Sequence, residues 1–161
     1  MKKFIISAIS LAILLMAFAC AEPSSTSDAG TTKETILPSS YLGTYKLTSL
    51  TDYYDEKIYD ADPSGISLKI TFDENDKIWY EGKFIEEDEA EHKIPKTEFG
   101  WFTLYTPETK VASVDTNENR ANWTFSGNTS KLRIKIEDGR YFKFGSDFET
   151  YYCSEIDLQK Q

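Results

Sequence analysis

Two short acidic stretches contain residue types that can hold a metal ion or move a proton. "EEDEAEH", residues 86–92, concentrates five acidic residues and the only histidine of the chain. "DADPSG", residues 60–65, places oxygen ligands at alternate positions before a glycine, like the front of a calcium loop. However, the twelfth position counted from Asp60 is Thr71, where a calcium loop has a bidentate glutamate. We therefore interpret 60–65 as a turn and 86–92 as a solvated loop between two strands.

The sequence contains no motif for a known type of catalysis. It has no second histidine for a zinc cage, no G-x-S-x-G nucleophile motif and no Gly-rich phosphate loop. Paired carboxylates can act as acid and base, as in glycoside hydrolysis, but 27 acidic residues offer too many pairs to select one. We predict a protein that is not an enzyme and uses no cofactor or metal, with a carboxylate-dependent hydrolase as an alternative.

The first of the two cysteines, Cys20, directly follows a stretch with the pattern of an N-terminal export signal. Two lysines precede "FIISAISLAILLMAFA", a run of sixteen uncharged residues. The run is short for a membrane span, which needs about 20 apolar residues. Ala17 and Ala19 provide the small side chains that a signal peptidase requires before its cleavage site.

At this point the chain resembles a bacterial lipoprotein, because "AFAC" is similar to the lipobox of that family. The resemblance implies that residues 1–19 are a lipoprotein signal peptide and that Cys20 carries the lipid. It also implies a place in the bacterial cell envelope, periplasmic or at the cell surface, with membrane lipid as a partner. The alternative is an ordinary signal cleaved after Ala19, which would leave a free N-terminal cysteine.

Residues 20–40 have the composition of a flexible tether. They are dominated by Ser, Thr, Gly, Pro and Ala and show no apolar period, so they bury too little apolar surface to fold.

The chain that remains after cleavage of the signal is strongly acidic. Removing residues 1–19 takes away two lysines and no acid, which changes the net charge from −9 to −11. This charge argues against nucleic acid as a partner. With Cys20 acylated, Cys153 has no disulfide partner in the chain. We also expect the protein to be a monomer.

From Tyr41 onward the apolar residues alternate with polar ones, as half-buried strands require. "ISLKITFD", residues 66–73, and "KLRIKIED", residues 131–138, each place apolar side chains on one face and polar side chains on the other. Between the second stretch and "RYFKFG" lies Asp138-Gly139, which predicts a tight hairpin turn. Weaker runs of the same kind are separated by turn-rich segments.

The strand pattern predicts an all-β fold. About eight short strands joined by short loops favour an antiparallel up-and-down meander, and such a meander can close into a barrel without exposed edges. We place this barrel at residues 41–156 and treat 157–161 as a short C-terminal tail.

The head of the first strand, "YLGTYKLTS", resembles the G-x-W opening of bacterial lipocalin-like proteins, which are calycin-type β-barrels. Gly43 and Tyr45 stand in the corresponding places. The resemblance implies a barrel with a closed end near Tyr45 and one open end, which binds a small apolar ligand or another protein. In this family a basic residue from a late strand packs over the aromatic ring, and Arg140 and Arg133 are the candidates for it.

We expect ligand contacts from aromatic side chains, with Trp79 and Trp101 preferred because Gly82 and Gly100 lie nearby and leave room for a ligand. Tyr80 and Tyr105 complete the expected ligand-binding set. Trp123 shares one strand face with Ala121 and Phe125, so we assign it to the core. The alternative is that all of these aromatics simply pack in and on the strands.

The predicted function is that of a membrane-anchored lipoprotein whose barrel binds a small apolar ligand without catalysis. The alternative is a protein-interaction or inhibitor module of the cell envelope with a filled barrel. The barrel interior distinguishes the two, because a carrier needs an apolar void and an interaction module does not.

Overall fold

The computed structural model describes residues 34–62, 64–85, 90–137, 139–145 and 150–161. The signal peptide, Cys20 and residues 20–33 of the expected tether lie outside the described residues. The described elements are η1 (Ser39–Tyr41), β1 (Gly43–Asp52), β2 (Ile58–Asp60), β3 (Ser67–Phe72), β4 (Lys77–Ile85), β5 (Glu91–Thr106), β6 (Val111–Asp115), β7 (Arg120–Gly127), β8 (Lys131–Ile136), β9 (Phe142–Gly145) and β10 (Thr150–Lys160).

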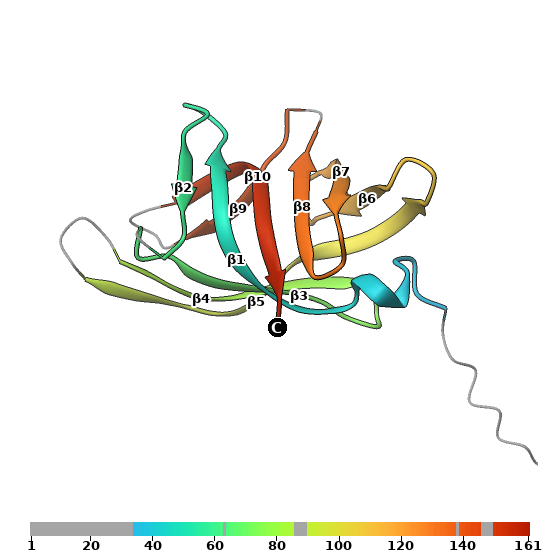
Figure 1. The fold of residues 1–161 in the computed structure, drawn as a ribbon, viewed down its shortest axis with the longest axis horizontal. Coiled ribbons are helices and arrows are strands. Elements are labelled where there is room, and N and C mark those ends of the chain that lie inside the picture. The colour runs from blue at the N-terminus through green and yellow to red at the C-terminus, as the bar shows by residue number, and fades with distance from the viewer. Residues whose placement is uncertain (1–33, 63, 86–89, 138, 146–149) are drawn as a thin grey trace, which may run out of the picture. The chain divides into compact units, whose positions relative to one another are not determined.

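These strands form a closed antiparallel barrel, as the sequence predicted (Figure 1). The hydrogen-bonded order is β2-β1-β3-β4-β5-β6-β7-β8-β10-β9, and pairing of β1 with β10 closes the ring. Both β2 and β3 pair with β1, one after the other along its length. In the same way β8 and β9 both pair with β10, so the wall of the barrel is eight strands, two of them interrupted.

The prediction of a hairpin at Asp138-Gly139 is wrong, although Asp138 itself lies outside the described residues. Lys135 lies opposite Glu155 and Phe142 lies opposite Cys153, so β8 and β9 follow each other in one direction along β10. Gly139 has a positive φ of 65°, which glycine adopts without strain. The local sequence signal for a turn therefore marks an interruption of one strand, because the distant strand β10 pairs with both halves.

The expected alternation within the strands is confirmed. Along β3 and β8, Leu68, Ile70, Leu132 and Ile134 are buried while Lys69 and the other lysine and arginine side chains between them face outward. Large aromatic side chains fill the interior of the barrel. They are Tyr45, Phe72, Phe84, Phe102, Trp123, Phe125, Phe142 and Phe144, each at most 2% exposed.

One end of the barrel is closed by η1 and the residues around it, as the family resemblance implied. Tyr41 of η1 packs its ring against Phe125 at 5.5 Å and against Tyr105 at 5.9 Å. Tyr45 is fully buried, and its hydroxyl donates to the Tyr41 carbonyl at 2.8 Å. The C-terminus lies at this same end (Figure 1).

The basic residue over the Tyr45 ring is Lys160, not Arg140 or Arg133. Lys160 pairs with Tyr45 across the β1–β10 ladder, and its Nζ lies 5.6 Å from the ring centre. Arg133 instead forms two hydrogen bonds to Asp157 on the outer surface, at 2.7 and 2.8 Å.

Both ends of the folded unit extend beyond the expected boundaries. β10 continues to Lys160, so residues 157–160 belong to the barrel and are not a tail. At the other end, Leu37 is fully buried and the Ile36 amide donates to the Asp76 carboxylate at 2.6 Å. The segment from residue 34 to 40 is therefore packed on the barrel, and the expected tether is shorter by these residues.

Candidate ligand-binding cleft

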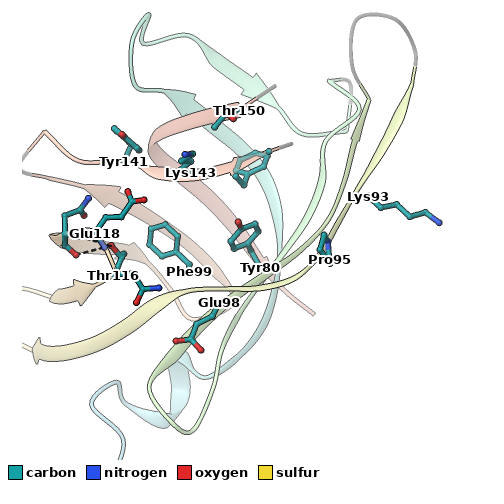
Figure 2. Close-up of a pocket in the computed structure, with 14 residues that line it drawn as sticks. Tyr80, Lys93, Pro95, Glu98, Phe99, Thr116, Glu118, Tyr141, Lys143 and Thr150 are labelled. Atoms are coloured by element: carbon teal, nitrogen blue, oxygen red, sulfur yellow. Dashed lines mark hydrogen bonds between the residues drawn. The ribbon is translucent and has the colours of Figure 1, made fainter. Parts of the chain in front are cut away.

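A cleft of about 860 Å³ opens at the end of the barrel opposite η1 (Figure 2). It lies among the start of β5, the turn between β6 and β7, and β9. Its lining residues are Tyr80, Lys93, Pro95, Glu98, Phe99, Thr116, Asn117, Glu118, Asn119, Tyr141, Lys143, Phe144, Gly145 and Thr150. The volume is in the range of sites that hold small molecules.

Aromatic rings form the floor of the cleft. Phe99 packs on the buried Phe142 with ring centres 4.6 Å apart, and Tyr80 meets the same ring edge-to-face at 5.6 Å. Below them, the Trp123 ring lies 5.6 Å from Phe99. Since Trp123 is fully buried, the barrel interior beneath the cleft is filled with side chains. A ligand would therefore sit at the mouth of the barrel, above this floor.

A β-bulge aims Phe99 into the barrel. Ile78 pairs with Gly100 and Trp79 pairs with Glu98, so Phe99 is the extra residue between two ladder positions. Bulges commonly redirect a side chain in this way. The bulge appears only in the pairing of β4 with β5, and the sequence pattern does not indicate it. The residues expected to bind ligand therefore do not include Phe99.

Polar groups form the rim, and a short turn holds some of them in place. The Thr116 hydroxyl oxygen accepts hydrogen bonds from the amides of Glu118, at 3.2 Å, and Asn119, at 3.1 Å. Glu98 pairs with Lys77 at 2.5 Å. Burial raises the pKa of Tyr80, and the protonated hydroxyl of a tyrosine can donate a hydrogen bond.

Of the four residues expected to bind ligand, only Tyr80 lines the cleft. Trp79, its neighbour in β4, points outward, where its indole N–H donates to the Asp73 carboxylate at 2.8 Å. Trp101 lines a separate pocket, together with Ile36 and Asp76. Tyr105 packs at the closed end against Tyr41. Trp79 and Tyr80 are adjacent in β4, so their side chains point to opposite faces of the strand. The sequence alone therefore indicates that the two residues do not line the same site.

The two glycines near the tryptophans serve the packing of strands and do not make room for a ligand. A Cβ at Gly82 would lie 2.0 Å from the Ser67 carbonyl oxygen, and one at Gly100 would lie 2.2 Å from that of Asp115. Glycine is therefore required at both positions because a neighbouring backbone approaches closely.

Residues 63 and 86–89 of the two acidic stretches lie outside the described residues, and the described acidic residues of these stretches make ordinary surface contacts. Asp62 pairs with Lys46 at 2.9 Å, and Glu91 pairs with Lys83 at 2.5 Å. β5 begins at Glu91, so the end of the expected loop is strand, and His92 stacks on Phe84 with ring centres 5.4 Å apart. In the described part of the chain no group of three or more His, Cys, Asp and Glu residues is placed to hold a metal ion.

None of the helices in the described ranges is long and apolar enough to cross a membrane. Comparison of the chain with models of protein families, with curated proteins and with solved structures found no match.

Proposed function

We propose that this chain is a lipid-anchored protein of the bacterial cell envelope whose barrel binds a ligand, without catalysis, in the open-end cleft. The observation that carries the proposal is the cleft itself, an 860 Å³ space with an aromatic floor at the mouth of an otherwise filled barrel. Binding sites of this kind combine apolar walls with a few placed polar groups. The ligand has an apolar part that reaches Phe99 and Tyr80 and polar groups that meet the rim.

The anchor at Cys20 fits the way the chain enters the barrel. Residues 34–42 lead into β1 at the closed end, where Leu37 and Tyr41 pack. A tether joined there leaves the mouth of the barrel accessible. The resemblance to lipocalin-like proteins supports the same proposal, because Gly43, Tyr45 and Lys160 together form the closed end.

The filled interior favours a second candidate, a protein-interaction module. Trp123 and Phe142 occupy the space that an enclosed apolar carrier would leave for its ligand. Both candidates use the mouth of the barrel and differ in what occupies it.

Intrinsic fluorescence tests the proposal, because Trp123 lies directly beneath Phe99. The chain from residue 20 with Cys20→Ser is titrated with fatty acids, retinoids and short glycans, and native mass spectrometry of protein purified from its host identifies any retained molecule. Tyr80→Ala should weaken binding about tenfold or more, since a buried aromatic contact is removed. Tyr105→Ala, at the opposite end, should leave the affinity unchanged. Absence of any bound molecule in both measurements would contradict the proposal.

A further inference from the structure

The cleft is bordered by two strand edges that have no neighbour among the described strands. β9 pairs with β10 on one side only. β5 pairs with β4 from Glu91 to Trp101, but its pairing with β6 begins only at Trp101, so residues 91–100 also lack a strand on that side. Among the described strands, the ladder that closes the barrel through β6, β7 and β8 therefore leaves a local gap between residues 91–100 of β5 and the edge of β9.

The cleft runs along the backbone of β9. Its lining includes Lys143, which faces outward, and Phe144, which faces the interior, together with Gly145 at the end of the strand. Side chains of adjacent residues point to opposite faces of a strand. A cavity that touches both of them reaches the strand from its edge, where backbone N–H and C=O groups are presented.

The two edges are not equivalent as hydrogen-bonding partners. β5 carries Pro95, which has no N–H and is a common means of protecting an edge, and its register shifts between Tyr80 and Gly82 of β4. β9 contains neither a proline nor a register shift. Lys143, the one charged side chain of β9, lies on the outer face with its Nζ 5.9 Å from the Tyr152 ring centre.

We propose that the edge of β9 accepts an extended peptide segment of a partner protein, which adds a strand to the barrel at the cleft. This inference rests on the proposed binding role of the cleft and names the class of its ligand. Strand addition gains affinity from main-chain hydrogen bonds and specificity from contacts of alternate side chains. Here the open edge of β9 would supply the main-chain hydrogen bonds, and the aromatic floor of the cleft would contact the alternate side chains.

The geometry also sets the chemistry of the peptide. β9 has four residues, which corresponds to about 13 Å of extended chain, so four or five peptide residues can pair with it. Every second side chain would point to Phe99, Tyr80 and Phe144 and should be apolar. The lining carries both Lys93 and Lys143 and both Glu98 and Glu118, so the fit does not require a net charge of either sign.

Selection from a displayed library of random twelve-residue peptides provides the probe, with the chain from residue 20 carrying Cys20→Ser as the target. We expect enriched peptides with apolar residues at alternate positions. Adding such a peptide should slow amide hydrogen exchange about tenfold or more at those residues of 142–145 whose N–H groups face the open edge, since these amides become hydrogen-bonded.

Backbone N-methylation of the peptide supplies the matched control. N–H groups of alternate residues point to the same edge of a strand, so methylation of one alternate set should weaken binding about tenfold or more while methylation of the other should not. Equal effects of the two sets, unchanged exchange in β9, or no enriched peptide would overturn the inference. If small molecules bind with an affinity that depends on Tyr80 but peptides do not bind, the proposed function holds and the peptide inference fails. If neither small molecules nor peptides bind, both the proposed function and the peptide inference fail.

Discussion

The ammonium group of Lys160 lies 5.6 Å from the centre of the Tyr45 ring and donates a hydrogen bond to the Ser40 carbonyl at 2.9 Å. This contact joins the end of the last strand to the start of the first strand and to η1. It also explains Gly43, since a Cβ there would lie 3.2 Å from Cε of Lys160, at a φ of 126°. The closed end of the barrel thus depends on residues that are more than a hundred positions apart.

Replacing Lys160 with alanine should lower the free energy of unfolding by about 1 to 2 kcal/mol, because a cation–π contact and a hydrogen bond are lost together. Urea denaturation followed by tryptophan fluorescence measures this change. Lys160→Arg keeps the cation and should recover most of the stability, whereas Lys131→Ala, at an exposed position, should have almost no effect. Equal losses for Lys160→Ala and Lys131→Ala would show that the contact does not stabilise the fold.

The sequence was sufficient to predict the strands and their buried faces, because burial imposes a period of two wherever the ladder is regular. Ile70 and Ile134 are examples of this. It was not sufficient where the outcome depends on a distant strand. Asp138-Gly139 carries a local turn signal, but both of its flanking strands pair with β10. Lys160 was missed for the same reason, because only strand register places it over Tyr45.

The candidate site was predicted less well than the fold, since bulges and curvature decide which side chains reach the cleft. Phe99 enters the interior at a bulge that no sequence period indicates. Nearby glycines suggest Trp79 and Trp101 as ligand contacts, yet those glycines accommodate the backbone of neighbouring strands. Size and aromatic character alone therefore do not distinguish a ligand contact from a side chain on the outer wall.

A charge on the inner face of β8 should unfold the barrel. Ile134 is fully buried, so Ile134→Glu should cost several kcal/mol through burial of an unpaired carboxylate. Lys135→Glu makes the same substitution on the outer face, opposite Glu155, and should cost less than about 1 kcal/mol through like-charge contact. Circular dichroism during urea denaturation measures both, and equal effects would mean that the faces of β8 are wrongly assigned.

The closed end should lose stability at alkaline pH. Burial, with a smaller effect from nearby Tyr41, raises the pKa of Tyr45 to about 12. An unfolded tyrosine ionises near pH 10, so this stability is fully present below about pH 10 and is lost as the pH rises toward 12.

Denaturant midpoints measured between pH 9 and 12 test this dependence, with tyrosinate absorbance followed in parallel. Tyr45→Phe cannot ionise at this position, so its stability should fall less steeply with pH than that of the unchanged protein. Burial also raises the pKa of Tyr105 to about 12, so part of the slope should persist in the variant. An identical slope in both proteins would contradict the assignment to Tyr45.

The proposed lipid anchor requires Cys20, and the second cysteine of the chain provides a matched control. Cys153 is fully buried, and burial raises the pKa of its thiol, so it should not react with lipid or with thiol reagents in the folded protein. In cells labelled with an alkyne fatty acid, the unchanged protein and Cys153→Ala should both carry the label and partition with membranes. Cys20→Ser should lose the label and move to the soluble fraction. An unlabelled wild-type protein would instead support an ordinary signal peptide cleaved after Ala19, with Cys20 as a free N-terminal residue.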